Sequence, residues 1–328
     1  MPCMQIGILI SSAAVIRPTW TTAHLAQAAL VAGNTVRFFE PGSMEVTTQG
    51  RVVTRAHVLD KPERTSTDLA VKLSRHQLTR RYIDVGSLNL LMMRANPLTP
   101  TVLNLALMAQ DRGVRVDNDP TGIALTRSKT WLASLMDVPR PRTLVTTDTD
   151  AATAFAEKQP HGVVLKPANG SGGRGVQLVR SPHKVKRAMA DVMIAHPGPV
   201  VVQNYLPEAD DGEKRLFWVD GQIVGGYLRQ RAPGSFLHNL QRGGQPQPTE
   251  VLDTDQAIVS AITPHLRKAG IVLAGLDIIG SALVECNTLN PGGIHYAESF
   301  RNTDGPTIAE ETLQIITRTW NTAEAIHA

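Results

Sequence analysis

The feature that most constrains the fold is a glycine-dense loop with an apolar strand on each side. Residues 170–175 read Gly-Ser-Gly-Gly-Arg-Gly, with Gly162–Leu165 before them and Val176–Val179 after them. Four glycines in six residues let backbone N–H groups converge on phosphate oxygens without interference from Cβ atoms. A Walker loop or a dinucleotide fingerprint would require a helix after the glycines. The flanking strands predict a hairpin tip that folds over phosphates as a lid, the alternative being a flexible turn.

Strands and helices alternate along the chain and predict an α/β fold. Over residues 1–122, short apolar strands are separated by helices such as Thr21–Ala32 and Val102–Asp111, which indicates a parallel α/β unit. The two prolines of Asp137–Pro141 then force extended backbone and break the pattern. We predict three domains, which cover residues 1–122, 123–200 and 201–328.

Composition and charge argue against several classes of protein. The formal net charge is +4, but the basic residues are scattered and aromatics make up only 4%, which does not favour a nucleic-acid-binding surface with stacking platforms. Cys3 and Cys286 match neither a disulfide framework nor a zinc motif. The apolar run Met4–Ile10 is too short to span a membrane and lacks the basic start of a signal peptide. We therefore expect a cytoplasmic protein with no membrane or nucleic-acid partner.

Two lysines lie where an ammonium group can reach phosphates under the loop. Lys166 ends the strand that enters the glycine loop, and Lys129 lies on the first turn of a helix predicted at Ser128–Met136. For each lysine the alternative is a solvated surface charge.

The strongest local signal is Gly275–Asn287, in which two apolar strands flank a Gly-Ser turn. Glu285 and Asn287 are two residues apart on one strand and face the same side. Asp277 joins that face if the turn has three residues, and the opposite face if it has two. Carboxylates among apolar residues are costly unless they bind a cation, and carboxylate and amide oxygens suit Mg²⁺. The alternative is a pair of exposed acids at a sheet edge.

These motifs, in this order and spacing, make the chain resemble the prokaryotic glutathione synthetases of the ATP-grasp superfamily over nearly its whole length. The resemblance rests on Leu165–Pro167 with Gly170–Gly175, on Gln203–Pro207, on Asp211–Arg215 and on Gly275–Asn287. It implies an ATP-grasp fold with a pre-ATP-grasp domain at 1–122, a central lid domain at 123–200 and a metal-binding C-terminal domain at 201–328. It also implies a homo-oligomer.

The resemblance implies a role for each matching residue. Phosphate contacts would come from two lysines and the lid, namely Lys129, Lys166, Gly170, Ser171, Gly172 and Gly173. The nucleoside would be bound by Gln203, Asn204, Tyr205, Leu206 and Glu213. Two Mg²⁺ ions would be held by Asp277, Glu285 and Asn287. Arg215 and Arg231 would stabilise the transferring phosphoryl group and the tetrahedral intermediate.

The implied activity is ATP-dependent amide-bond formation between a small-molecule carboxylate and an amine. Phosphorylating the carboxylate creates a good leaving group, and the cations and Mg²⁺ neutralise charge in both steps. Because an acyl phosphate hydrolyses in water, such an enzyme needs a closing lid. Residues 231–244, rich in glycine, are a candidate second lid, with an ordinary surface loop as the alternative. The best single assignment is γ-glutamylcysteine with glycine.

The acceptor end departs from the family pattern. Where members carry Ser-Pro-Thr after the metal-binding asparagine, this chain has Asn290–Gly293, and Ile294–Tyr296 lacks the usual arginine. The altered substrate pocket is predicted to use Trp20, Arg94, Asn290, Gly292, Gly293 and His295. Packing or surface positions are the alternative for Trp20 and His295. Other functions consistent with the pattern are ligation of a different amino acid or small peptide, an inactive nucleotide-binding regulator, and a kinase that stops at phosphoryl transfer.

Overall fold

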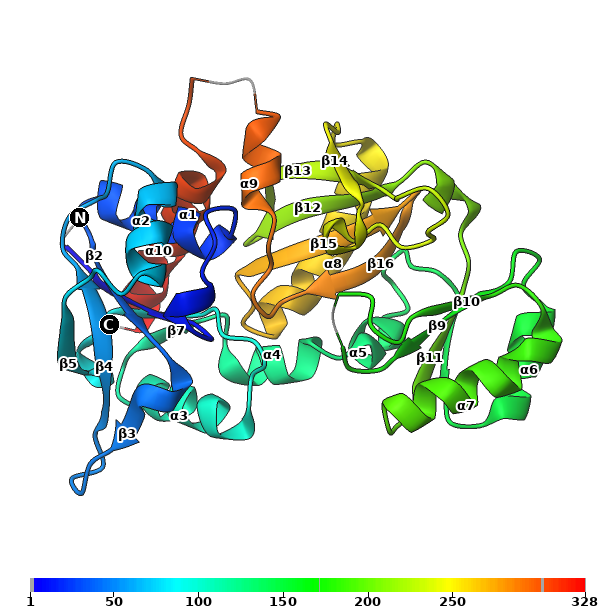
Figure 1. Cartoon of the computed structure of the whole chain (residues 1–328), viewed down its shortest axis with the longest axis horizontal. Coiled ribbons are helices and arrows are strands. Elements are labelled where there is room, and N and C mark those ends of the chain that lie inside the picture. The colour runs from blue at the N-terminus through cyan, green and yellow to red at the C-terminus, as the bar shows by residue number, and fades with distance from the viewer. Residues whose placement is uncertain (1–2, 171, 302–303, 328) are drawn as a thin grey trace.

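Three β-sheets follow one another along the chain. The structure is a computed structural model that describes residues 3–170, 172–301 and 304–327, with side chains through residue 318. Figure 1 shows the N-terminal sheet at one end of the molecule, the second sheet at the other end and the third sheet between them. Short 3₁₀ turns lie at Ala13–Val15, Pro41–Ser43, Val85–Ser87, Pro182–Lys184, Pro207–Asp210 and Leu240–Arg242.

The first sheet has a parallel centre and an antiparallel extension. Its parallel strands are β1 (Gln5–Leu9), β2 (Thr35–Phe39), β6 (Leu90–Met93) and β7 (Arg115–Asp117). The predicted parallel unit is therefore confirmed. The antiparallel strands, which the sequence patterns did not indicate, are β3 (Met44–Val46), β4 (Val52–Leu59) and β5 (Arg80–Asp84).

Capping residues set where the helices of this domain begin and end. They are α1 (Thr21–Val31), α2 (Ser66–Ser74) and α3 (Pro100–Gln110). The predicted start of α3 at Val102 is two residues late, because the Thr99 side chain accepts a hydrogen bond from the Val102 N–H and Pro100 occupies the first turn. Gly33, with φ of +82°, follows the end of α1 as predicted.

The second sheet is antiparallel and carries the glycine loop. Its strands run in the order β10 (Gln177–Val179), β9 (Val163–Pro167), β11 (Val200–Asn204) and β8 (Thr143–Thr146). Apolar residues from β9 and β11 form a separate core with α6 (Thr149–Glu157) and α7 (Val185–Ala195). The loop therefore joins two paired strands, β9 and β10, as predicted.

The third sheet is also antiparallel and holds the acidic segment. Its strands run in the order β14 (Gln245–Gln247), β13 (Gln222–Gln230), β12 (Glu213–Val219), β15 (Leu273–Ile279) and β16 (Ala282–Asn287). The helices of this part and of the linker before the second sheet are α4 (Pro120–Thr126), α5 (Lys129–Ser134), α8 (Asp253–Lys268), α9 (Ile294–Ser299) and α10 (Ile308–His327). None of the helices within the described ranges is long and apolar enough to cross a membrane.

Contacts between distant segments tie the first and third sheets together. The Asn118 amide donates to the carbonyl oxygens of Leu273 and Thr288, each at 2.7 Å, and its oxygen accepts from the N–H groups of Val272 and Leu273. Helix α10 packs against α1 of the first sheet, as Figure 1 shows. The division into domains at residues 122 and 200 stays a prediction; the second boundary falls at the first residue of β11.

Candidate active site

A deep cavity lies between the second and third sheets. It encloses about 1000 Å³ of empty space, part of it open to solvent, and the glycine loop and the segment after β13 contribute to its walls. The cavity is lined by nearly all the predicted ATP and metal residues that the structure describes: Lys129, Lys166, Gly170, Gly172, Gly173, Gln203, Asn204, Tyr205, Leu206, Glu213, Arg215, Asp277, Glu285 and Asn287. Ser171 lies outside the described residues.

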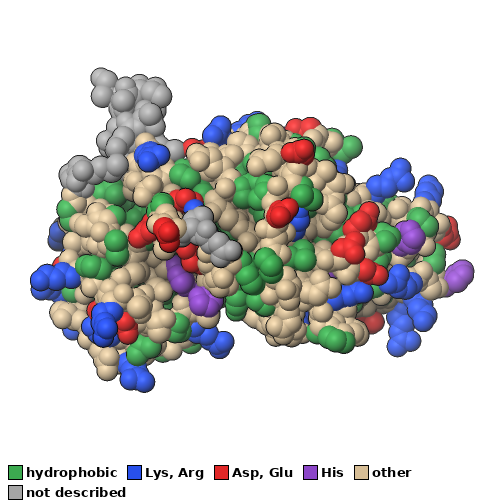
Figure 2. Space-filling model, turned by 90° about the horizontal axis from the view of Figure 1, so that it is seen from above, with side chains coloured by type: hydrophobic (Ala, Val, Ile, Leu, Met, Phe, Trp, Pro, Cys, Tyr) green, Lys and Arg blue, Asp and Glu red, His purple; other side chains and the backbone are tan. Residues whose placement is uncertain are grey.

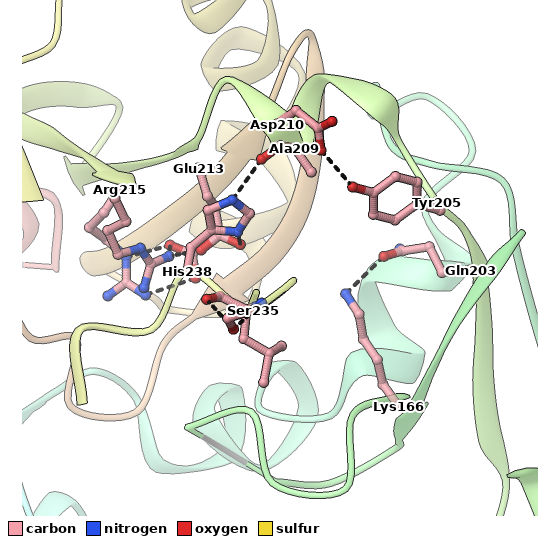
Figure 3. A network of polar contacts seen from close by, with 12 residues as sticks. Lys166, Gln203, Tyr205, Ala209, Asp210, Glu213, Arg215, Ser235 and His238 are labelled. Atoms are coloured by element: carbon pink, nitrogen blue, oxygen red, sulfur yellow. Dashed lines mark hydrogen bonds and ion pairs between the residues drawn. The ribbon is translucent and has the colours of Figure 1, made fainter. Parts of the chain in front are cut away.

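Lys166 is held in the cavity by a neighbouring strand. Its Nζ donates to Gln203 Oε1 at 2.8 Å (Figure 3). The Gln203 amide in turn donates to Thr143 Oγ1 at 3.2 Å. Burial lowers the pKa of Lys166, and the nearby Glu285 carboxylate acts in the opposite direction. A partly desolvated cation of fixed orientation is suited to binding a phosphate group.

Lys129 connects the glycine loop to the acidic segment. Its Nζ donates to the Gly170 carbonyl oxygen at 2.9 Å and lies 3.2 Å from Glu285 Oε1. Its backbone N–H donates to the Ala168 carbonyl at 3.0 Å, and Ser128 caps the helix that begins at Lys129. The start of α5 is therefore fixed to the strand end from which the loop departs.

Asp277 accepts hydrogen bonds from two arginines and an amide. Arg215 binds it in bidentate fashion, through Nε to Oδ1 at 2.5 Å and through a terminal nitrogen to Oδ2 at 2.8 Å. Arg229 lies 2.5 Å from Oδ1, and Asn287 Nδ2 donates to Oδ2 at 3.0 Å. Burial alone would raise the pKa of Asp277, but Arg215 and Arg229 outweigh it and lower that pKa to about 2. The carboxylate is therefore ionised at neutral pH.

Arg229 was missed by the sequence interpretation. Its buried guanidinium also pairs with Glu213, opposite it on β12 (Figure 3). Burial raises the pKa of Glu213 to about 7, although Arg229 opposes this effect. His238 lies on the other side, with Nε2 at 2.7 Å from the Ala209 carbonyl oxygen and Nδ1 4.0 Å from Glu213. The signal for Arg229 lay in the β12–β13 hairpin, whose pairing sets Arg229 against Glu213.

The turn between β15 and β16 has two residues, yet Asp277 pairs with Glu285. Ile279 pairs with Ala282 and Ile278 with Leu283, but Val284 is an extra residue that shifts the register by one. This β-bulge brings Asp277 opposite Glu285. The prediction that a two-residue turn separates them onto opposite faces is therefore wrong, because it assumed regular pairing. Asp277, Glu285 and Asn287 all line the cavity.

The two predicted lids contact each other. Arg242 Nε donates to the Gly172 carbonyl oxygen at 3.2 Å. A Cβ atom at Gly173 would come within 2.8 Å of Asn239 Oδ1, and Gly173 has φ of +68°. The glycine is therefore required both by its conformation and by the close approach of the second loop. Together the two loops cover one side of the cavity.

Arg231 is placed apart from the charged cluster. It pairs with Asp210 at 3.0 Å and lines a neighbouring groove with Gly234 and Phe236 rather than the cavity. Asp210 also accepts a hydrogen bond from the Tyr205 hydroxyl at 3.0 Å (Figure 3). In this arrangement the arginines beside the predicted metal residues are Arg215 and Arg229.

The predicted substrate residues lie between the first and third sheets. Arg94 is buried and donates to Thr22 Oγ1 and to the Pro291 carbonyl oxygen. Burial lowers the pKa of Arg94 to about 9. Its guanidinium thus joins the two parts of the chain, and Asn290 lines a small cleft with it.

Gly292, Gly293 and the aromatic rings of the predicted substrate residues also form contacts between separate elements. The Gly292 carbonyl oxygen accepts from Arg215 at 3.2 Å, and the Gly293 N–H donates to Thr21 Oγ1 at 3.1 Å. The His295 ring lies 5.5 Å from the His24 ring of α1, and Trp20 packs on the apolar core at the start of that helix. This region therefore meets the charged cluster through Arg215 and Gly292.

The donor set at the acidic segment fits a small oxygen-preferring cation. Glu285 is half-buried and lies beside Lys129, while the side chain of Asn287 offers an amide oxygen in addition to the N–H that bonds Asp277. All four lone-pair directions of Asp277 are engaged by Arg215, Arg229 and Asn287. A cation bound between Asp277 and Asn287 would replace their mutual hydrogen bond, and two carboxylates with an amide oxygen suit Mg²⁺.

Comparison with known proteins decides the family. The family described as "Prokaryotic glutathione synthetase, ATP-grasp domain" matches residues 128–302. A glutathione synthetase of Synechococcus elongatus is 30% identical over 226 residues, which cover 67% of this chain and 68% of the relative. The chain belongs to the prokaryotic glutathione synthetase family of ATP-grasp ligases. It is therefore an ATP-dependent ligase that forms amide bonds, as the motifs predicted.

Solved structures confirm the fold of this glutathione synthetase family member. D-cycloserine synthetase DcsG superposes with a TM-score of 0.65 at 17% identity, covering 94% of this chain and 98% of that one. D-alanyl-alanine synthetase A from Vibrio cholerae gives a TM-score of 0.62 at 13% identity, covering 97% and 99%. The predicted ATP-grasp fold with an N-terminal α/β domain is thus confirmed, and at these identities the likeness concerns the fold alone.

We expect Lys166→Met to weaken ATP binding by about 10- to 100-fold, because a charge-assisted hydrogen bond to a phosphate is lost in a partly desolvated site. Titration calorimetry with ATP alone measures the change. Lys158→Met, at the exposed end of α6 in the same domain, is the matched control and should change the affinity less than about twofold. Equal affinity of the Lys166 variant and the wild type would contradict the assignment.

Proposed function

We propose that the chain activates a small carboxylate as an acyl phosphate and joins it to an amine, with γ-glutamylcysteine and glycine as the first assignment. The observation that carries this proposal is the convergence of charges in one lidded cavity. Five basic residues (Lys129, Lys166, Arg174, Arg215 and Arg229) and three acidic residues (Glu213, Asp277 and Glu285) line it. A site of this kind stabilises the negative charge that moves during phosphoryl and acyl transfer.

Different residues would act in the two steps of the reaction. In the first step, a carboxylate oxygen of the substrate forms a bond to the γ-phosphorus and the bond to ADP breaks, while Lys129 and Lys166 neutralise the phosphate oxygens. In the second, the amine nitrogen, after losing a proton, bonds to the acyl carbon and inorganic phosphate leaves. Arg215, which reaches both Asp277 and the Gly292 carbonyl, is suited to hold the acyl oxygen in this step.

Asp277, Glu285 and Asn287 would hold Mg²⁺, with two ions expected from the family resemblance. When bound, Mg²⁺ neutralises phosphate charge and aligns the reacting oxygens. Gln203 to Leu206, at the end of β11, would receive the adenine, and Glu213 the ribose. The contacts between the two loops support their role in excluding water from the acyl phosphate.

A second candidate is ligation of a different amine or small peptide. The buried Arg94 is engaged by Thr22 and Pro291 rather than turned to an open site. The Asn290–Gly293 segment carries no hydroxyl side chain, and the His295 ring lies beside that of His24, tilted by 49°. These features favour an acceptor that differs from glycine in charge or size, because a site that lacks matched charges binds a charged ligand poorly.

ADP release with Mg-ATP across a panel of amino acids and small peptides tests both candidates, with mass detection of the products. Glutathione formed from γ-glutamylcysteine and glycine supports the first assignment. ADP release and amide formation only with another pair supports the second. Release of ADP with a stable phosphorylated product and no requirement for an amine would contradict ligation. A homo-oligomer and a cytoplasmic location stay predictions.

A further inference from the structure

A second groove runs along the outer side of the lid sheet, next to the nucleotide cavity. It encloses about 1640 Å³ of empty space and is widely open to solvent. The start of α7 forms one wall, the segment after β13 forms the other, and β10 forms the floor. Phe236 lines both the groove and the cavity. The groove is therefore contiguous with the active site, although the ligase chemistry assigns it no role.

The groove is strongly basic. Arg180, Lys184, Arg187 and Arg231 line it, against the single acid Asp191. Lys184 is the N-cap residue of α7. Arg187 and Asp191 are four residues apart within α7 and so share one face of that helix. Neither Lys184 nor Arg187 forms an ion pair with an acidic side chain in the part of the chain that the structure describes. Figure 2 shows Lys and Arg side chains gathered at the end of the molecule that this domain forms.

Tyr205 and Asp210 contact two of the arginines, one of which, Arg180, also donates to the His161 carbonyl oxygen at 3.4 Å. The Arg180 guanidinium lies 4.9 Å from the centre of the Tyr205 ring. The Tyr205 hydroxyl donates to Asp210, which pairs with Arg231 at 3.0 Å. Each guanidinium has five N–H donors, so these contacts orient Arg180 and Arg231 and leave donors for a ligand. The same Tyr205 lines the nucleotide cavity.

The floor of the groove is the edge of a β-sheet. Strand β10 is at the end of its sheet and, among the described strands, pairs with β9 alone. Three consecutive residues of β10, 177–179, line the groove. Because successive side chains point to opposite faces of a sheet, a groove that touches all three runs along the strand's edge. Backbone N–H and C=O groups at such an edge can pair with an added strand.

We propose that this groove binds an extended, carboxylate-rich peptide segment. The segment adds a strand to the edge of β10 and places its carboxylates against Arg180, Lys184, Arg187 and Arg231. A sheet edge is complementary to a peptide backbone and not to a nucleic acid. Single-stranded nucleic acids also require several aromatic platforms, whereas Phe236 is the aromatic residue among those that line the groove. This binding is independent of which carboxylate and amine the enzyme joins.

Fluorescence anisotropy of a labelled oligoglutamate at low ionic strength tests the proposal, because salt screens exposed charges. We expect Arg187→Glu to weaken binding about fivefold. Lys186→Glu is the matched control, since Lys186 is the neighbouring residue on α7, pairs with Asp150 and does not line the groove. It makes the same change of charge and should alter binding less than about twofold.

A second peptide separates backbone pairing from charge alone. An oligoglutamate of the same length with every backbone nitrogen methylated keeps all the carboxylates but has no N–H donor for a sheet edge, and we expect it to bind about fivefold more weakly than oligoglutamate. The proposal is overturned if oligoglutamate does not bind, or if Arg187→Glu and Lys186→Glu weaken binding equally. It is also overturned if the N-methylated peptide binds as tightly as oligoglutamate, or if an oligonucleotide of equal charge binds more tightly through Arg187.

Discussion

Glu285→Gln is expected to lower the rate of ADP release about 10³-fold and to leave the fold intact. Glutamine keeps the size of the side chain, but it removes the negative charge that faces Lys129 and is proposed to bind Mg²⁺. The half-buried position of Glu285 at the cavity wall means that little packing is lost. Steady-state ADP release at saturating Mg-ATP measures the effect, and thermal unfolding followed by circular dichroism shows whether the fold persists.

Cys286→Ala provides a matched control for Glu285→Gln. Cys286 is the next residue on β16, and its side chain packs in the apolar core beneath the sheet. The variant should lose some thermal stability through the small cavity, but it should keep its turnover within about twofold at a temperature well below unfolding. Asn287→Ala changes the residue on the other side of Cys286, and that residue is also a proposed Mg²⁺ ligand. It should lower the rate of ADP release as Glu285→Gln does. Near-wild-type turnover of Glu285→Gln or Asn287→Ala would refute the metal assignment.

Arg229→Met is expected to reduce the free energy of unfolding by about 3 kcal/mol, because it breaks a buried ion pair. Arg229 is 7% exposed and pairs with both Glu213 and Asp277. Removing its charge leaves Glu213 in a desolvated position without its main cationic partner, while Asp277 retains Arg215. Urea unfolding of the protein without nucleotide measures the change at pH 9, above the pKa of Glu213 of about 7 in the folded protein.

Arg231→Met is the matched control for Arg229→Met, because Arg231 lies two residues further along the chain and the substitution is the same. Its partner Asp210 is 65% exposed, so the loss should stay below about 1 kcal/mol. The double variant Arg229→Met/Glu213→Gln should recover about 1 kcal/mol, since the unpaired carboxylate is neutralised. Equal losses for Arg229→Met and Arg231→Met, with no recovery in the double variant, would show that the buried network does not stabilise the fold.

The residues that are proposed to bind the nucleotide could be singled out in the sequence because their signals are local. A glycine-dense loop between strands is visible in six consecutive residues, and Lys166 adjoins it. The structure places Lys166, Lys129 and the loop glycines on one cavity wall. Asp277, Glu285 and Asn287 stood out for a similar reason, since oxygen-bearing side chains interrupt an apolar hairpin.

The acceptor side could not be predicted in the same way. Arg94 and Trp20 precede the Asn290–Gly293 segment by about 200 and 270 residues. Their contacts depend on how the first sheet docks against the third. Sequence spacing contains no information on that docking, so a buried Arg94 that bonds the Pro291 carbonyl could not be distinguished from one that faces a substrate.

The sequence by itself determined the α/β class, the ligase family and many of the residues that line the cavity between the second and third sheets. Only the tertiary structure decided how the charges meet. In both hairpins of the third sheet a single extra valine, Val224 or Val284, shifts the register by one and sets Glu213 opposite Arg229 and Asp277 opposite Glu285. A β-bulge is stabilised by side chains on neighbouring strands and by the twist of the whole sheet, and these contacts exist only once the strands have assembled.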